Sequence, residues 1–263
     1  MALITCRFFS KVLQYQTSMQ VILPESGPGI IGKKVHVPGG TYPVLWLYHG
    51  LSDNDSAWVR NTAIERYAQE YGLAVVMPDA ARSYYTDMAS GGRYWEFISR
   101  EVMTRARQFF PLSRRRSDNY AAGLSMGGFG AFKLALQKPR SVAAAGSFSG
   151  AVDILDRLQA AGRRTAEFER MFGPFETVPG SINDLSGTML KMTQDDKREL
   201  PALFQCCGTE DFLLQSNRTF HHAAEAVGIA HTYIEEDGFA HTWDYWEIAI
   251  RQFLEWLADQ NLT

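Results

Sequence analysis

A serine within a glycine-rich turn is the residue of this chain best suited to nucleophilic chemistry. Residues 123–127 read Gly-Leu-Ser-Met-Gly, with an apolar run before them at 120–122 and a helix-like run after them at 129–136. A strand, a sharp turn and a helix in this order form a nucleophile elbow, which holds the serine hydroxyl clear of the sheet. The alternative is a glycine-rich helix start that contains a serine by chance. The context favours a nucleophile at Ser125.

A serine hydroxyl is a weak nucleophile near neutral pH and needs an adjacent base. His241 follows Ser125 in the chain and lies in a loop, residues 238–243, between a predicted strand and the last predicted helix. The other histidines after Ser125 fall within predicted elements: His221, His222 and His231. We therefore predict His241 as the base, the alternative being a loop histidine without a chemical role.

A carboxylate must orient the imidazole and stabilise it once it is protonated. Asp211 directly follows the apolar strand predicted at residues 203–207, and we select it as the acid. The neighbouring Glu210 would point the other way in a tight loop. Weaker candidates follow the next strand: Glu235, Glu236 and Asp237. The alternative for Asp211 is a carboxylate that caps the following helix.

Attack on an ester carbonyl places negative charge on its oxygen, which two backbone N–H groups usually stabilise. The residue after the nucleophile, Met126, supplies one N–H group in a site of this kind. The loop at residues 48–52 follows the strand predicted at 44–48, and its Gly50 permits the turn that would present the N–H of Leu51. We expect His49 to brace this loop by hydrogen bonds.

Several aromatic residues fall in predicted loops and are candidate walls of an acyl or alcohol pocket, although each could also belong to the core. These residues are Trp58, Tyr84, Tyr85 and Trp243.

Apolar runs alternate with helical patterns along most of the chain. Buried strands are predicted at 44–48, 74–77, 142–148, 203–207 and 231–234, and helices at 62–71, 94–109, 216–227 and 243–257. Alternation of this kind predicts an α/β fold with a mostly parallel, twisted sheet and helices on both faces. Apolar and polar residues alternate at 19–23, before Pro24 and a turn at 27–29, which indicates antiparallel N-terminal strands.

The segment at residues 153–198 interrupts this alternation. It is polar and contains turns at Gly173-Pro174 and Pro179-Gly180. We predict an insertion over the active-site end of a single domain that spans residues 1–263, forming a cap or a partner surface.

The composition is that of an ordinary soluble protein, with 46% hydrophobic and 21% charged residues. The net charge of −3 gives no general attraction to nucleic acid or to an anionic membrane. No apolar run is long enough to span a bilayer, and the N-terminus lacks the pattern of a signal peptide. The basic run at residues 114–116 reads as a solvated loop.

The three cysteines, Cys6, Cys206 and Cys207, do not form a disulfide framework, and no Cys/His spacing indicates a zinc site. We expect Cys206 and Cys207 to be buried strand residues. The sequence therefore predicts a cytoplasmic protein without a metal.

Four segments taken together, at residues 49–54, 123–128, 208–211 and 238–243, resemble the bacterial tributyrin esterase family. That family is close to S-formylglutathione hydrolase (esterase D) and to feruloyl and acetyl-xylan esterases. Residues 58–62, 76–79 and 84–87 extend the resemblance over most of the chain.

The resemblance implies an α/β-hydrolase fold and a serine carboxylesterase that acts on short-chain acyl esters without a cofactor. It places the nucleophile, acid and base at Ser125, Asp211 and His241, and the oxyanion donors at Leu51 and Met126. Members of the family are often oligomeric, so a homo-oligomer is also expected. S-formylglutathione hydrolases typically carry a cysteine shortly after the His-Gly-Leu loop. This chain has Ser52-Asp53-Asn54 there, which weighs against a dedicated glutathione thioesterase.

The expected activity is hydrolysis of acetyl to butyryl esters through an acyl-enzyme, with a small-molecule ester as the partner and neither nucleic acid nor membrane. The alternatives are an acetyl or feruloyl esterase acting on esterified oligosaccharides, an S-formylglutathione hydrolase-like thioesterase, an acyltransferase, and an inactive hydrolase scaffold used for binding.

Overall fold

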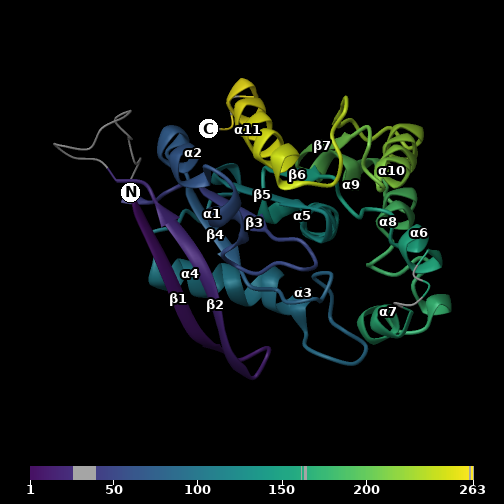
Figure 1. Ribbon diagram of the computed structural model, residues 1–263, viewed down its shortest axis with the longest axis horizontal. Helices are drawn as coiled ribbons and strands as arrows, with labels where there is room; N and C mark the ends of the chain where they lie inside the picture. Colours follow the sequence, from purple (N-terminus) through teal and green to yellow (C-terminus); the bar gives the residue numbers. More distant parts are fainter. Residues whose placement is uncertain (26–39, 161, 163–164, 261, 263) are drawn as a thin grey trace.

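A twisted sheet runs through the centre of the structure, a computed structural model that describes residues 1–25, 40–160, 162, 165–260 and 262 (Figure 1). Within these residues the sheet has eight strands in the order β1-β2-β4-β3-β5-β6-β7-β8. The strands are β1 (Ala2–Ser10), β2 (Tyr15–Leu23), β3 (Val44–Tyr48), β4 (Ala74–Pro78), β5 (Asn119–Leu124), β6 (Ala144–Phe148), β7 (Ala202–Gly208) and β8 (Thr232–Glu236). β1 pairs antiparallel with β2, and β2 pairs antiparallel with β4. The six strands β3 to β8 run parallel to one another.

Successive side chains of a strand point to opposite faces of the sheet, and each face of β3 is buried. Val44, Trp46 and Tyr48 join one hydrophobic cluster, which α5 (Met126–Gln137) and the helices over residues 94–109 cover. Leu45 and Leu47 join the other, which α2 (Ile64–Tyr71) and α11 (Trp243–Asp259) cover. Figure 1 shows α2 and α11 on one side of the sheet, and α3 (Tyr94–Glu96) and α4 (Met103–Phe109) on the other. Burial on both faces explains why the parallel strands read as continuous apolar runs.

Apart from α1, where no helix was predicted, the helices begin and end close to the predicted bounds. They are α1 (Ala57–Asn61), α2 (Ile64–Tyr71), α3 (Tyr94–Glu96), the π-helical turn η2 (Phe97–Val102), α4 (Met103–Phe109), α5 (Met126–Gln137), α10 (Leu214–Ala226) and α11 (Trp243–Asp259). Short 3₁₀ turns lie at η3 (Arg116–Asp118) and η4 (Pro139–Ser141). The helix predicted at 94–109 is thus one helical run with a π-helical centre. The strand predicted to end before Pro78 extends by one residue, so that β4 includes Pro78. The turn predicted at residues 27–29 lies outside the described residues.

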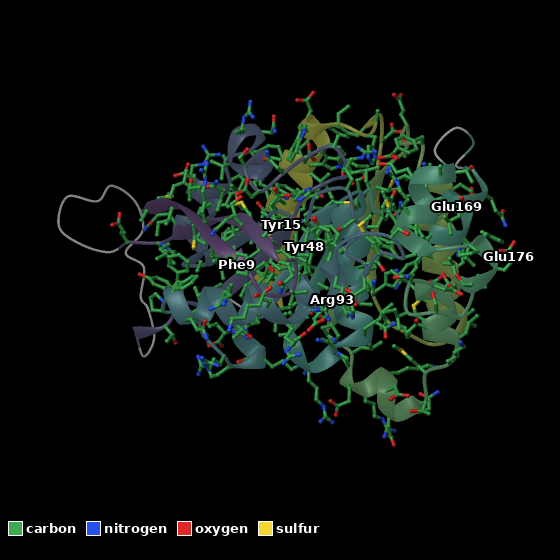
Figure 2. The ribbon with its side chains drawn as sticks, turned by 90° about the horizontal axis from the view of Figure 1, so that it is seen from below. Phe9, Tyr15, Tyr48, Arg93, Glu169 and Glu176 are labelled. Carbon is green, nitrogen blue, oxygen red and sulfur yellow. The ribbon has the colours of Figure 1, made fainter. Side chains whose placement is uncertain are left out.

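The segment at residues 153–198 forms short helices beside the carboxyl end of the sheet: α6 (Ile154–Gln159), α7 (Thr165–Phe172), η6 (Phe175–Thr177), α8 (Leu185–Leu190) and α9 (Gln194–Glu199). Figure 2 shows Glu169 and Glu176 of this segment at one end of the molecule, away from Phe9 and Tyr15 of the β1–β2 hairpin. An ion pair of 2.6 Å between Arg82 and Glu167 joins the segment to the loop after β4.

A buried lysine makes a further connection to this segment. The ammonium group of Lys133, on α5, donates to the side-chain oxygen of Asn183 (2.6 Å) and to the carbonyl oxygen of Tyr85 (3.2 Å). It also lies 4.8 Å from the centre of the Trp95 ring. The Lys133 side chain is completely buried, and burial lowers its pKa to about 7. The lysine therefore links three separate segments of the chain beneath the elbow.

Cys206 and Cys207 are free thiols buried in β7, as predicted. Across the residues that the structure describes, each helix is too short or too polar to cross a membrane.

Candidate active site

Ser125 lies at the turn between β5 and α5, with backbone angles of φ 53° and ψ −117°. A non-glycine residue rarely adopts a positive φ, and such strain is common at functional sites. Glycines on either side make the turn possible. A Cβ atom on Gly123 would lie 2.5 Å from the backbone of Gly127, and one on Gly127 would collide with the carbonyl oxygen of Tyr48. The close crossing of β5, α5 and β3 therefore requires glycine at both positions.

The three residues predicted to act together lie in one hydrogen-bonded chain. Nε2 of His241 is 3.0 Å from Oγ of Ser125, and Nδ1 of His241 is 2.8 Å from Oδ2 of Asp211. A carboxylate only accepts hydrogen bonds, so Nδ1 of the neutral ring carries the proton and Nε2 accepts from the serine hydroxyl. Ser125 thus faces the nitrogen lone pair that a base needs.

The surroundings of His241 and Asp211 hold the pair in place. The Asp211 side chain is fully buried, and its Oδ1 accepts the N–H of Leu213 at 2.8 Å, just before α10. The His241 ring packs against Phe212, with ring centres 4.6 Å apart, and meets the edge of Trp246 at 4.9 Å. Oδ2 therefore contacts the imidazole and Oδ1 contacts the turn before α10. The helix itself has no side-chain cap at its N-cap residue, Leu213, so Asp211 does not cap it.

The other acidic candidates lie away from the imidazole. Glu210 is exposed, Glu235 forms an ion pair of 2.5 Å with Arg218, and Asp237 accepts a hydrogen bond from Thr209. Of the acids considered from the sequence, Asp211 is the one in contact with His241.

His49 braces the loop after β3, as expected. Its Nε2 accepts the backbone N–H of Ala80 (2.9 Å), so its Nδ1 carries the proton and donates to the carbonyl oxygen of Gly50 (2.7 Å). Burial lowers the pKa of His49, against the opposing effects of the Gly50 carbonyl and nearby aspartates. The neutral, buried ring of His49 thereby holds the loop after β3 against the loop after β4.

The two residues predicted to donate to an oxyanion border Ser125 from different sides. Met126 is the first residue of α5, where the leading N–H groups of a helix have no acceptor within it and the helix dipole is positive. Leu51 lines the same cavity as Ser125. It lies in a turn that is closed by a hydrogen bond from the backbone N–H of Asp53 to the carbonyl oxygen of Gly50.

A cavity of about 550 Å³ opens above Ser125 and His241. Tyr84 and Trp243, two of the four aromatic residues predicted as pocket walls, line it. Several other lining residues were not predicted as pocket walls: Arg82, Arg157, Phe212 and Trp246. Phe212 directly follows Asp211 in the sequence, and Trp246 lies one helical turn after Trp243. Their closeness to predicted site residues is the sequence feature that could have indicated them as pocket walls. A separate groove of about 720 Å³, between the end of α5 and α9, contains none of the predicted site residues.

The prediction that Trp58 and Tyr85 line the pocket is wrong. Both side chains are completely buried. The indole N–H of Trp58 donates to the carbonyl oxygen of Tyr48 (3.0 Å). The hydroxyl of Tyr85 donates to the carbonyl oxygen of His49 (2.8 Å). The carbonyl groups where β3 ends need donors, and these two aromatic residues supply them from behind the loop. Trp58 contacts the pocket wall only indirectly, through the edge of Trp243 at 5.3 Å.

The chain is similar to known esterases and serine hydrolases over nearly its whole length. The Esterase family model matches residues 10–257. An acetyl esterase from Caldicellulosiruptor saccharolyticus is 30% identical over 266 residues, covering 98% of each chain. The fluorophosphonate-binding serine hydrolase F (FphF) of Staphylococcus aureus has a TM-score of 0.86 and 32% identity, over 97% of this chain and 98% of its own. An S-formylglutathione hydrolase (FrmB) from Staphylococcus aureus has a TM-score of 0.84 and 32% identity, with the same coverage.

A serine elbow on a mostly parallel sheet and similarity over nearly the whole chain lead to one assignment. The chain belongs to the Esterase family and is a serine carboxylesterase with the α/β-hydrolase fold.

Proposed function

We propose that this enzyme hydrolyses short-chain acyl esters, from acetyl to butyryl and including tributyrin, with Ser125 as nucleophile. The observation that carries the proposal is the chain of hydrogen bonds of 2.8 and 3.0 Å from Asp211 through His241 to a strained serine at the floor of a cavity. Nucleophile, base and orienting acid in mutual contact are the parts that acyl transfer requires.

In the first half of the reaction, Oγ of Ser125 bonds to the ester carbonyl carbon while its proton passes to Nε2 of His241. The carbonyl oxygen becomes an oxyanion and accepts the N–H groups of Leu51 and Met126. Loss of one such donor typically costs about 2.7–4 kcal/mol in the transition state. The tetrahedral intermediate then expels the alcohol, which takes the proton from His241 and leaves the acyl group on Ser125.

In the second half, water replaces the alcohol. Nε2 of His241 accepts a proton from water as its oxygen bonds to the acyl carbon, and then returns the proton to Oγ of Ser125 as the acid leaves. Asp211 keeps its charge throughout and stabilises the imidazolium that forms in each half.

The test is turnover of p-nitrophenyl acetate and butyrate by Ser125→Ala, beside Ser52→Ala as a matched control. Ser52 is an exposed serine that lines the same cavity without contacting His241. We expect loss of turnover in Ser125→Ala alone, with both variants folded as wild type. Wild-type turnover in Ser125→Ala would overturn the assignment.

Tyr84 and Trp243 support a preference for short acyl chains, because rigid aromatic walls set the size of the space beside Ser125. A series of p-nitrophenyl esters should show a steep fall in kcat/KM beyond butyrate.

The same series run beside acetylated and feruloylated oligosaccharides and S-formylglutathione tests the alternative substrates. Added alcohols test acyl transfer against hydrolysis.

We propose that the insertion at residues 153–198, within a single domain of residues 1–263, shapes the leaving-group side of this pocket. Arg157 of the insertion lines the cavity and lies 5.5 Å from the centre of the Phe212 ring. Arg157→Ala should change the ranking of alcohols more than the ranking of acyl groups, and an unchanged ranking would contradict this role.

We further propose a homo-oligomer in the cytoplasm. Free thiols at Cys6, Cys206 and Cys207 suit a reducing compartment. Size-exclusion chromatography with light scattering tests the oligomer, and cell fractionation tests the location.

A further inference from the structure

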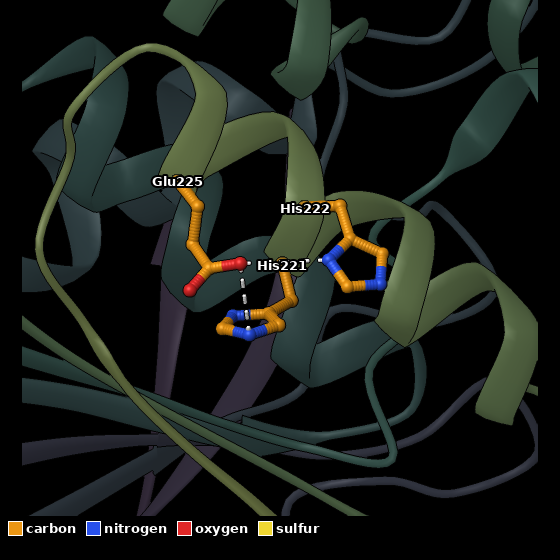
Figure 3. Close-up of side chains that lie close together, drawn as sticks. All are labelled: His221, His222 and Glu225. Carbon is orange, nitrogen blue, oxygen red and sulfur yellow. Dashed lines mark hydrogen bonds and ion pairs between the residues drawn. The ribbon is translucent and has the colours of Figure 1, made fainter.

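A cluster of metal-ligating atoms lies on α10, on the surface beside β8. Nε2 of His221 lies 3.4 Å from Oε2 of Glu225, and Nδ1 of His222 lies 3.5 Å from the same oxygen. One ligand atom from each of the three residues lies within 4.8 Å of the other two. Figure 3 shows the rings of His221 and His222, adjacent residues of α10, beside the carboxylate of Glu225, which lies one turn further along the helix.

These separations match the edges of a tetrahedral metal site. Zinc binds imidazole nitrogen at about 2.0–2.1 Å and carboxylate oxygen at about 2.0–2.2 Å, which places two ligand atoms of a tetrahedron about 3.4 Å apart. Two edges of the cluster already have this length. The third, between the two rings, can be closed by rotation of the His222 side chain, which is 73% exposed.

A neighbouring histidine holds His221 in the orientation of a metal ligand. Nδ1 of His221 lies 3.1 Å from Nε2 of His231, the residue before β8. The His221 ring also stacks on Tyr233, with ring centres 4.5 Å apart. Metal-binding histidines generally donate their second ring N–H to a carboxylate, a backbone carbonyl or water, which fixes both the tautomer and the ring plane. Nε2 of His231 takes the place of such an acceptor here.

The direction of the hydrogen bond between the two rings determines what His221 presents to Glu225. Two ring nitrogens can bond only when one carries a proton. If His231 donates, Nε2 of the neutral His221 ring carries the proton and points it at Glu225. If Nδ1 of His221 donates to His231, then Nε2 of the neutral ring holds a lone pair that faces a carboxylate oxygen 3.4 Å away. A lone pair and an anionic oxygen at this separation require a cation between them, either a proton or a metal ion.

We propose that His221, His222 and Glu225 bind one divalent transition-metal cation of the zinc class, with His231 as the residue that orients His221. Two imidazoles and one carboxylate suit zinc, nickel or copper rather than magnesium or calcium. Glu225 is 59% exposed, so the ion can enter from solvent and water can complete its coordination.

The site is separate from the ester-hydrolysis machinery and adds nothing to that reaction. Its ligands come from α10, while His231 precedes β8, so the bound ion strengthens a contact between this helix and this strand. The expectation of no zinc site rested on the absence of a Cys/His spacing typical of zinc sites. The pattern here is His-His-x-x-Glu within a helix, where residues four apart share a face.

Isothermal titration calorimetry of the full, untagged, metal-free chain with Zn²⁺ tests the proposal. Wild type should bind with a saturable component of one ion per chain that Glu225→Gln and His222→Gln each weaken at least tenfold. Mg²⁺ and Ca²⁺ should show no such component. His231→Gln should weaken binding by about tenfold to a hundredfold, although it removes no ligand atom.

Glu255→Gln is the matched control. Glu255 lies on α11, is 54% exposed, and pairs at 3.4 Å with Arg251, the residue four positions before it. It should bind Zn²⁺ as wild type does. Every variant should hydrolyse p-nitrophenyl acetate at the wild-type rate in metal-free buffer, which shows an intact fold.

Co²⁺ provides a second readout, since tetrahedral coordination gives intense visible bands that a proton between His221 and Glu225 cannot give. These bands should appear in wild type and in Glu255→Gln and should disappear in Glu225→Gln. Absence of the one-ion component, or equal Zn²⁺ affinity in Glu225→Gln and Glu255→Gln, would overturn the site. Unchanged affinity in His231→Gln would overturn the orienting role.

Discussion

Replacing Asp211 with asparagine reverses the polarity of the contact to His241 while keeping the shape of the side chain. In the wild type, Oδ1 of Asp211 accepts the N–H of Leu213 at 2.8 Å. The amide oxygen of asparagine can accept the same N–H group, so the turn before α10 is retained. The amide NH₂ then faces Nδ1 of His241 in place of a carboxylate oxygen, and donates to it. Nε2 must therefore carry the proton, and it can no longer accept one from Ser125.

The expected cost is about 10⁴-fold in kcat, as in other serine hydrolases whose orienting aspartate becomes asparagine. At about 1.36 kcal/mol for each factor of ten, this is roughly 5.4 kcal/mol of transition-state stabilisation. Stability should change little, because the substitution preserves volume and the Leu213 contact in a fully buried position.

Steady-state hydrolysis of p-nitrophenyl acetate measures the loss, with thermal melting as the check on folding. Glu210→Gln is the matched control, since Glu210 is the adjacent acid but is exposed. It should retain wild-type kcat. A folded Asp211→Asn enzyme within tenfold of wild type would refute the reasoning, and so would an equal loss in Glu210→Gln.

Two further predictions concern the elbow and the helix behind it. Gly127→Ala places a methyl group against the carbonyl oxygen of Tyr48, so we expect a loss of about 1–3 kcal/mol in stability together with most of the activity; wild-type melting and turnover would contradict this. Burial lowers the pKa of Lys133 from 10.5 to about 7, so between these values the unfolded chain holds a proton that the folded chain lacks, and stability rises with pH. Denaturant unfolding at pH 7, 8 and 9 should show wild type gaining on Lys133→Met by about 1 kcal/mol per pH unit, and a constant difference would refute the assignment.

Much of the fold was predictable because the parallel strands are buried on both faces. Residues 44–48 and 203–207 are continuous apolar runs, and the structure has strands at Val44–Tyr48 and Ala202–Gly208. The position of the elbow was predictable for a different reason. Glycine two residues before and after Ser125 is a steric requirement of the crossing with β3 and not a preference, so it is visible in the sequence.

The pocket walls were less predictable, because loop position alone does not determine which way an aromatic side chain points. Trp58 and Tyr85 point inward, since their N–H and O–H groups satisfy carbonyl oxygens at the end of β3. Tyr84, directly beside Tyr85, lines the cavity instead. Arg157 reaches the cavity from the insertion, and this depends on tertiary packing that no local pattern encodes.

The histidines of α10 show the opposite limitation. Their position within a helix argued against a role as base in the hydrolytic reaction, and they lie away from Ser125 in a cluster of their own. The same helical spacing that made them poor candidates for one chemistry brings them together for another.

The central claim is that Ser125 is the residue that attacks the ester. Its most direct test is intact-mass and peptide mass spectrometry after exposure to a fluorophosphonate probe, comparing wild type, Ser125→Ala and Ser52→Ala. The account predicts one adduct per chain on Ser125 in wild type and in Ser52→Ala, and no adduct in Ser125→Ala. An unlabelled wild-type enzyme, or an adduct of equal yield in Ser125→Ala, would contradict it.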